Sequence, residues 1–511
     1  MDCINQFSAK NPVKTETQTA FLEALQKTHI HGSIETEGHV NYVIHTTPWN
    51  LRCQPKPLAL VYANTADDVA AVVKLAAQYG IPIQPRSGGH SYASYSLGGT
   101  SGSLVVDLAA MDKVVVDQKT WRATIGPGTR LKGVTDGLLK QGKRTIAHGV
   151  GLQVGMGGHA TVGGQGPLAR MYGLTIDHVV EMEVVLADGS IVRASATENS
   201  DLFWALRGAG ASFGIVTSFT VITHPISTSV THYSFQLTIG SPNDAATPAK
   251  LAAFFMKWQE FISSPVVLAD RTFNSTIVIM NWAVLIQGTR FGTKAELEES
   301  EVMVLMNKHF ENIDLKCREL DWVASGVAWE TDVVYQVTGS LPIPMYMKSL
   351  SVRKDKLLTQ EAITRWFEYL HKHAPGDTVW VILGDLEGGA ISDVANDATA
   401  YAQRDSLFAL TVYSIAKLPF PDDVLAFLNG MIDTVNNAMP DGNFGVYPGY
   451  VDPLIPKSEW PTRYWGANYP RLLKIKEKYD PNNVFANPQS VGNHLVSREG
   501  TMSAMHITPV A

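Results

Sequence analysis

The feature that most constrains this fold is a change in the spacing of apolar residues near residue 222. Before it, short apolar runs alternate with one helix-like segment, and after it longer strand-like runs alternate with amphipathic segments. The chain has 511 residues, which is longer than a single hydrophobic core usually supports. We therefore expect an α+β fold of packed units with room for a large ligand between them.

The first 221 residues predict a mixed α/β unit that opens with a β-α-β segment. An apolar run at 58–62 precedes Asn64 and Thr65, apolar residues then recur at 69, 72, 73 and 76, and Gly80 ends the helix pattern. The run at 81–83 returns the chain to a sheet. Further strands are expected at 104–108, 114–116 and 123–125, and at 184–187 and 191–194 on either side of Asp188-Gly189.

The segment from 222 to about 440 predicts an antiparallel sheet covered by helices. Long strands are expected at 231–238 and 275–285, and amphipathic helices at 249–262, 294–310, 359–373 and 422–438. A last helix is expected at 469–479, because Asp480-Pro481 then ends the helical pattern. The polar tail after Val491 is expected to be disordered.

Composition excludes several classes of partner. The net charge of −7 is spread without a basic block, so neither a nucleic acid nor an anionic membrane surface is expected as a partner. No apolar stretch approaches the roughly 20 residues that cross a bilayer. The start of the chain is polar through Gln18 and lacks an export signal, which predicts a cytoplasmic protein unless this start is processed or engineered.

The three cysteines, Cys3, Cys53 and Cys317, are too few for a disulfide framework or a tetrahedral metal site. We expect one mobile terminal thiol, two partly buried thiols and no metal centre.

The first candidate ligand loop leaves the strand expected at 81–83. Paired glycines let a backbone approach a pyrophosphate and offer it N–H donors, and a neutral imidazole held there could act as a nucleophile. On the residues alone, a tight turn is the more ordinary interpretation. The loop residues are Arg86, Ser87, Gly88, Gly89, His90, Ser91 and Tyr92.

A second glycine-rich stretch covers 154–166, where the lack of side chains suits a backbone lying against a large planar or anionic ligand. A Rossmann fingerprint is the competing interpretation, but no acidic residue follows at the required distance, since Asp177 comes too soon. His159 is expected to pack or to form hydrogen bonds. The residues that we select here are Val154, Gly155, Gly157, Gly158, His159, Gly163 and Gly164.

Together these segments resemble the berberine-bridge-enzyme-like and vanillyl-alcohol-oxidase superfamily with its PCMH-type FAD-binding domain, and most of all the fungal oligosaccharide (glucooligosaccharide-type) oxidases. The similarity continues through most of the chain, and its later motifs are Gly173-Leu-Thr-Ile-Asp, Asn199-Ser-Asp-Leu-Phe-Trp, Gly214-Ile-Val and Asn487-Pro-Gln-Ser. The resemblance implies a two-lobed protein. An FAD-binding domain would be formed by 1–221 and 441–511, and a substrate-binding domain by 222–440.

The resemblance also implies the cofactor and its attachment. FAD would be bonded covalently at its 8α position to His90, and Gly151 stands where many members carry a second, cysteinyl attachment. One covalent link is therefore expected. Val154 corresponds to a residue that influences the access of oxygen. Further FAD contacts are expected from Gly214, Ile215, Val216, Tyr447, Asn487 and Gln489.

Tyr450 and Asp385 are the candidate catalytic residues, because carbohydrate-oxidising members place a tyrosine base and an aspartate beside the flavin. A phenol with a pKa of about 10 is a weak base at neutral pH, so proton transfer through Tyr450 to Asp385 must accompany hydride departure. A lid aromatic and a turn aspartate are the ordinary alternatives.

The substrate is expected to be a small molecule, with oxygen as acceptor and hydrogen peroxide as product. A carbohydrate-like alcohol or hemiacetal is favoured, although Leu383 and Gly449 stand where sugar-oxidising relatives carry glutamine and asparagine. An intracellular oxidase or cyclase of secondary metabolism and a non-catalytic flavin-bearing binding protein remain alternatives. We expect a monomer or weak homodimer. Aromatic residues that could line the pocket are Trp49, Trp282, Trp329 and Tyr335.

Overall fold

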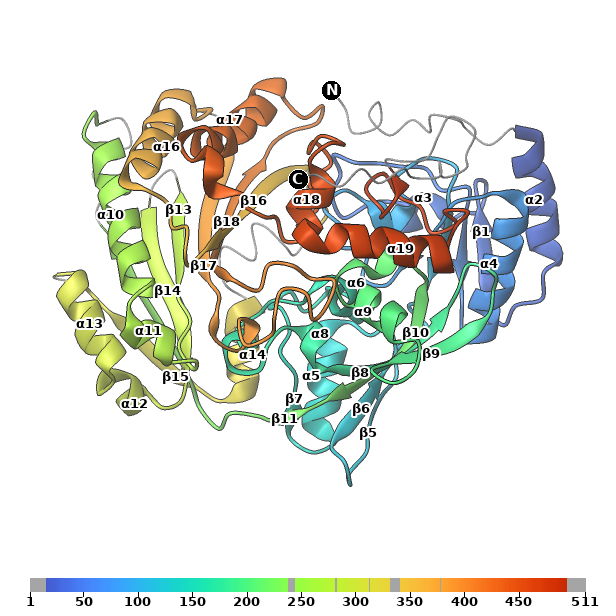
Figure 1. Cartoon of the computed structure of the whole chain (residues 1–511), viewed down its shortest axis with the longest axis horizontal. Coiled ribbons are helices and arrows are strands. Elements are labelled where there is room, and N and C mark those ends of the chain that lie inside the picture. Colours follow the sequence, from blue (N-terminus) through green and yellow to red (C-terminus); the bar gives the residue numbers. More distant parts are fainter. Residues whose placement is uncertain are drawn as a thin grey trace.

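The computed structural model describes residues 15–237, 244–280, 283–311, 313–330, 341–376 and 378–493. Two lobes lie side by side, one built around two smaller sheets and the other around one large sheet (Figure 1). This mixed architecture confirms the predicted α+β class. Trp282, Tyr335, Cys3 and the tail beyond residue 493 lie outside the described residues.

The first sheet has the order β1-β2-β4-β3, in which β2 and β3 run parallel to β4. Helix α4 connects β2 to β3 as predicted: Thr65 caps its first turn, and Gly80 ends it with a φ of 64°. The buried face of α4 packs in the core of this sheet together with α2. The elements are α2 (Thr15–Lys27), β1 (Ser33–Thr36), α3 (Tyr42–His45), β2 (Ala59–Tyr62), α4 (Ala66–Tyr79), β3 (Ile83–Arg86) and β4 (Leu104–Asp107).

The second sheet has the antiparallel order β5-β6-β10-β8-β9. Its core includes side chains of α18 and α19, so residues from both ends of the chain build this lobe. The elements are β5 (Val114–Val116), β6 (Arg122–Ile125), α5 (Leu131–Lys140), α6 (Met156–Val162), β8 (Val179–Val185), β9 (Ile191–Ser195), α9 (Ser200–Ala209), β10 (Ile215–Ile222), α18 (Trp460–Trp465) and α19 (Tyr469–Tyr479).

Short elements connect this lobe to its neighbour, and β7 pairs with β11. They are β7 (Arg144–Thr145), α7 (Ala169–Tyr172), α8 (Thr175–His178) and β11 (His224–Pro225).

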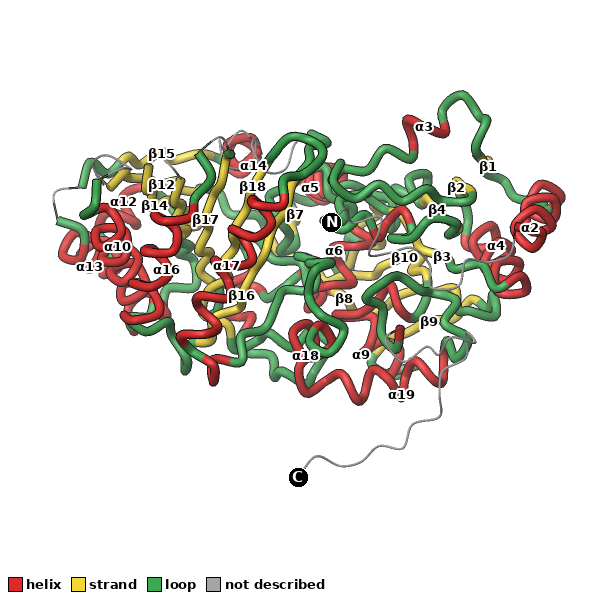
Figure 2. The backbone as a smooth tube through the Cα atoms, turned by 90° about the horizontal axis from the view of Figure 1, so that it is seen from above, coloured by secondary structure: helices red, strands yellow, loops and turns green. Residues whose placement is uncertain are grey.

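The large sheet of the other lobe is antiparallel, with the order β15-β12-β14-β13-β17-β18-β16. Helices α10, α13, α16 and α17 lie along one face of it (Figure 2). The strands are β12 (Val230–Leu237), β13 (Thr276–Met280), β14 (Ala283–Phe291), β15 (Lys316–Leu320), β16 (Met345–Arg353), β17 (Val379–Leu386) and β18 (Ser406–Ile415). The helices are α10 (Thr247–Ile262), α11 (Pro265–Ala269), α12 (Lys294–Glu298), α13 (Glu301–His309), α14 (Trp322–Glu330), α16 (Gln360–His373) and α17 (Asp422–Ala438).

Side chains of β13 and β17 alternate between the two faces of the large sheet, and this alternation determines which of them point toward the lobe of the two smaller sheets. Ile277 and Ile382 belong to the core beneath the helices, whereas Val278 and Leu383 belong to a cluster that also contains Trp49 of the first lobe. The second face of the large sheet is therefore turned toward the first lobe.

Two predicted elements of this lobe were wrong in their extent. The strand expected at 275–285 is the antiparallel hairpin of β13 and β14, in which Met280 pairs with Ala283. The helix expected at 294–310 is divided into α12 and α13, because the Ser300 side chain accepts a hydrogen bond from the Met303 N–H and begins a new helix.

Two further observations concern the chain as a whole. None of the helices in the described part of the chain is long and apolar enough to cross a membrane. Cys317 is a partly buried free thiol, as predicted. Cys53 is buried and disulfide-bonded, which corrects the expectation of an unpaired thiol at that position.

Candidate active site

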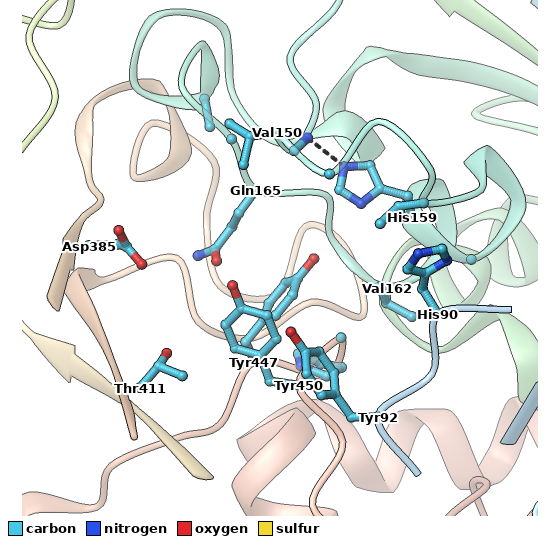
Figure 3. Close-up of a pocket in the computed structure, with 18 of the residues that line it drawn as sticks. His90, Tyr92, Val150, His159, Val162, Gln165, Asp385, Thr411, Tyr447 and Tyr450 are labelled. Atoms are coloured by element: carbon cyan, nitrogen blue, oxygen red, sulfur yellow. Dashed lines mark hydrogen bonds between the residues drawn. The ribbon is translucent and has the colours of Figure 1, made fainter. Parts of the chain in front are cut away.

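A cavity of about 920 Å³ lies between the large sheet and the first lobe (Figure 3). This volume is near the upper end of the roughly 300–1,000 Å³ that ligand sites occupy. Its walls come from segments that are far apart in the sequence: the loop after β3, the glycine-rich turn before α6, the segment after α9, the end of β17 and the loops around 447–451 and 487–490.

The loop after β3 presents His90 to the cavity. Gly89 makes the turn with a φ of 74°, a conformation that favours glycine. The His90 Nδ1 lies 3.0 Å from the Gly88 carbonyl oxygen, and its ring packs against Trp49 with centroids 5.1 Å apart. Burial lowers the pKa of His90, so the imidazole is neutral near pH 7 and keeps a nucleophilic nitrogen.

The polar residues that precede His90 have structural partners. The Arg86 guanidinium binds Asp107 and the His45 carbonyl, and Arg86 does not line the cavity. The Ser87 hydroxyl lines the cavity, donates to the Pro127 carbonyl at 2.5 Å and accepts from the Gly157 N–H at 3.1 Å. Both side chains therefore hold the loop in place. Arg86 pairs with Asp107 of the neighbouring strand β4, and Ser87 forms hydrogen bonds with the backbone of Pro127 and Gly157.

The second glycine-rich stretch forms the turn into α6 and its first residues. Gly155 lies against Gly88, and a Cβ at Gly158 would meet no atom within 4 Å. His159 lines the cavity, but its Nε2 accepts a hydrogen bond from the Gly149 N–H at 3.0 Å, and burial lowers its pKa to about 3. His159 is thus neutral and holds the turn, as its predicted hydrogen-bonding role required.

The remaining predicted contacts divide into two groups. Ser91, Tyr92, Val154, Gly214, Val216, Asn487 and Gln489 line the cavity. Gly163, Gly164 and Ile215 do not: the two glycines pack behind the cavity wall, and Ile215 is buried in the core of the first sheet.

The close approach of Gly88 and Gly155 gives a testable prediction. A Cβ at Gly155 would lie 2.1 Å from the Ser87 Oγ and 2.2 Å from the Gly88 backbone N, so Gly155→Ala must push the two loops apart. We expect the fraction of chains that retain flavin after purification to fall at least tenfold, measured by absorbance. Gly158→Ala is the control for folding, since its methyl group meets open space; equal flavin retention in the Gly155 variant and the wild type would contradict the prediction.

Three tyrosines form the part of the cavity that faces His90 and Asp385. Tyr447 and Tyr450 pack edge to face with centroids 4.9 Å apart, and Tyr92 packs edge to face on Tyr450 at 5.7 Å. The Tyr447 hydroxyl accepts a hydrogen bond from the Gly164 N–H at 2.7 Å. The Tyr450 hydroxyl has no hydrogen-bond partner among the described residues, so it is available to a ligand.

The Tyr450 phenol is strongly held in its neutral form. Burial raises its pKa well above the ordinary range, and Tyr92 and Asp385 raise it further. A free phenolate is therefore disfavoured, and a proton can enter Tyr450 only as another leaves it.

Asp385 lies at the end of β17, on the cavity side of the large sheet. Its carboxylate accepts a hydrogen bond from the Thr276 hydroxyl at 2.7 Å, and burial raises its pKa. Within the described part of the chain, Asp385 influences Tyr450 through its charge but forms no direct hydrogen bond with it. Proton transfer between them consequently requires a bridging water, a substrate group or a small movement.

Gln165, Thr411 and Glu387 line the cavity and were missed by the sequence reasoning, whereas Trp49 and Trp329 line it as predicted. The described residues provide no hydrogen-bond partner for the Trp49 Nε1, the Gln165 Nε2, the Thr411 Oγ1 or the two carboxyl oxygens of Glu387. A ligand or water must satisfy such buried groups. The signal for Glu387 was present, because it lies two residues beyond Asp385 and alternation along a strand brings both to one side.

The residues that are present fit a dinucleotide with a flat ring system. The glycine turn at 155–158 leaves open space, His90 offers a neutral nitrogen at the same wall, and unsatisfied polar atoms surround the cavity near the tyrosines.

Comparison with known proteins gives the family. The family described as "FAD binding domain" matches residues 57–195, and the one described as "Berberine and berberine like" matches residues 446–492. The chain is 34% identical to the FAD-linked oxidoreductase sorD of Penicillium rubens over 88% of this chain and 93% of that protein. It is 33% identical to the glucooligosaccharide oxidase of Sarocladium strictum, covering 87% of this chain and 89% of that protein.

The solved structures agree with this relationship. The xylooligosaccharide oxidase from Myceliophthora thermophila C1, in complex with xylobiose, superimposes with a TM-score of 0.84 at 31% identity, covering 93% of this chain and 99% of that chain. The glucooligosaccharide oxidase of Acremonium strictum gives a TM-score of 0.83 at 31% identity, covering 94% and 99%. The chain therefore belongs to the FAD-linked oxidoreductases, in the branch that contains the fungal oligosaccharide oxidases and the berberine-bridge-like proteins.

Proposed function

We propose that this protein oxidises a hydroxyl-bearing carbon, an alcohol or hemiacetal of a carbohydrate-like small molecule, with FAD bonded covalently to His90. The observation that carries the proposal is that one cavity brings a neutral histidine, a phenol without a protein partner and a buried carboxylate together. In Figure 3 the tyrosines lie between His90 and Asp385.

FAD, when bound, supplies the acceptor for a hydride from the carbon. The protein moves the proton: the substrate hydroxyl donates to the Tyr450 oxygen while the Tyr450 proton passes toward Asp385. Because burial raises the pKa of both groups, neither a free phenolate nor a separated charge pair is favoured, and the transfers must occur together.

The proposed link to the cofactor is single. Gly151 lines the cavity wall beside Val150 and has no side chain that could bond to a ring. The related glucooligosaccharide oxidase of Acremonium strictum has a 6-S-cysteinyl, 8α-N1-histidyl FAD. Gly151 offers no sulfur for a second bond, so His90 is the residue that we propose for a single attachment.

A carbohydrate-like substrate and oxygen as electron acceptor complete the proposal. Relatives are named for oxidising gluco-, xylo- and chito-oligosaccharides. The wall near Asp385 combines the apolar Leu383 with the unsatisfied Thr411 hydroxyl, so some substrate hydroxyls would meet carbon and others a polar partner.

The test is replacement of His90. In His90→Ala we expect the acid-precipitated protein to be colourless and its position-90 peptide to lack the mass of FAD, whereas the wild type stays yellow. His371→Ala, at an exposed histidine of α16, is the matched control. Anaerobic addition of cello-, xylo- and chito-oligosaccharides to the wild type should bleach the flavin; yellow precipitate from the alanine variant, or no bleaching by any hydroxylated compound, would count against the proposal.

A further inference from the structure

The cavity contains a second carboxyl group that the proposed reaction does not use. Glu387 is 4% exposed, lines the cavity and follows Asp385 by two residues. Neither carboxyl oxygen of Glu387 has a hydrogen-bond partner among the described residues. A buried carboxylate without partners is costly, so this environment favours the neutral acid.

No cation among the residues that the structure describes pairs with either of the two carboxyl groups. Neither Asp385 nor Glu387 forms an ion pair within the described ranges of the chain. The buried Arg170 guanidinium donates instead to the main-chain carbonyls of Phe273, Val267, Asp270 and Glu387. If both Asp385 and Glu387 were ionised, the two negative charges would repel each other strongly, because the buried surroundings have a low dielectric constant.

The groups that face this pair are acids or neutral donors. The charge of Asp385 raises the pKa of Glu387, and the Ser406 hydroxyl lowers it. The side chain of Glu387 also lies near enough to three phenols for its charge to raise their pKa values. These phenols are Tyr401, Tyr447 and Tyr450.

We propose that Asp385 and Glu387 form a carboxyl pair that carries one negative charge in the resting enzyme, with Glu387 as the neutral member. Glu387 is then a positioning residue for the proposed reaction: it keeps the buried charge at one, so that Asp385 is the ionised group that receives the proton from Tyr450. The catalytic meaning of the pair rests on the proposed function, but its protonation state does not.

Burial and the charge of Asp385 raise the pKa of Glu387 to about 8, while an unfolded glutamate ionises near pH 4.5. Between these values the unfolded chain loses a proton that the folded chain keeps, so the stability that Glu387 contributes falls as the pH rises from about 4.5 to about 8. Above pH 8 both states are ionised and the fall ends.

Infrared spectroscopy of the holoenzyme tests the pair without any substrate. At pH 7 the wild type should show the band of a buried carboxylic acid, which disappears as the pH passes about 8. Glu387→Gln should lack that band, and it should also lose the wild-type decline of the melting temperature between pH 5 and pH 8. Glu477→Gln, at an exposed position of α19, should leave both observations unchanged.

Two more measurements separate this pair from the proposed function. Asp385→Asn removes the neighbouring charge and should shift the midpoint of the acid band to lower pH, which gives a test even if the glutamine variant does not fold. The second measurement is the pH profile of anaerobic bleaching: the wild-type rate should change as the pH passes about 8, where Glu387 ionises, and Glu387→Gln should lose that change because its amide stays neutral. Absence of the band from the wild type, or its persistence in Glu387→Gln, would overturn the pair; failure of every substrate with the band intact would overturn only the proposed reaction.

Discussion

Replacing Tyr450 by phenylalanine should slow anaerobic bleaching of the flavin by about 10²- to 10⁴-fold, the range that a positioned acid or base contributes. The Tyr450 hydroxyl has no protein partner in the described structure, so its removal leaves no buried group unpaired. The melting temperature and the covalent flavin content should therefore match the wild type. Stopped-flow absorbance under anaerobic conditions measures the rate.

Tyr447→Phe is the matched control for this prediction. The Tyr447 hydroxyl accepts from the Gly164 N–H at 2.7 Å, and its loss strands a buried donor at a cost of about 1–3 kcal/mol. That variant should lose stability and keep most of its bleaching rate. If Tyr447→Phe lost the rate and Tyr450→Phe kept it, the two roles would be reversed.

The fold was largely readable because most of its elements carry one clear period. The buried face of α4, with Val69, Val72 and Val73, repeats at helical spacing between a threonine cap and Gly80, and the structure has that helix at 66–79. The β13–β14 hairpin was not readable, because a single polar residue, Asn281, interrupts the apolar run between Met280 and Ala283, and no glycine or proline marks the reversal. One asparagine in an apolar run is too weak a signal to divide it into two buried strands.

The site residues were predictable where a motif requires one particular side chain. They were less predictable where the role of a side chain depends on its contacts in the folded protein. His90 and Tyr450 stand in motifs whose chemistry requires those side chains, and both line the cavity. Arg86 was predicted as a residue of the ligand loop, yet the parallel register places it opposite Asp107 in β4, and that pairing appears only after β3 and β4 are assembled. Glu387 could be placed by alternation from Asp385, but its lack of partners is a property of the packed structure.

Removing the contacts that hold α19 in the lobe of the two smaller sheets has the second large expected effect. The Lys476 Nζ is fully buried and donates to the Asp480 carboxylate at 2.6 Å and to the Ser212 carbonyl at 2.7 Å. Asp480 also accepts from the N–H groups of Val484 and Phe485, at 2.7 and 2.9 Å. This cluster joins α19, the cavity wall after α9 and the segment that leads to Asn487.

Lys476→Met should therefore destabilise the fold by about 3–5 kcal/mol, the cost of leaving one member of a buried ion pair without its partner. Denaturant unfolding followed by circular dichroism measures the change. Lys478→Met is the matched control, because Lys478 lies on the same helix, is 58% exposed and pairs with Asp201 at the surface, where an ion pair contributes little. Since Ser212 lines the cavity, the Lys476 variant should also bind less flavin; equal stability of the two methionine variants would show that the buried pair does not hold the C-terminal segment in place.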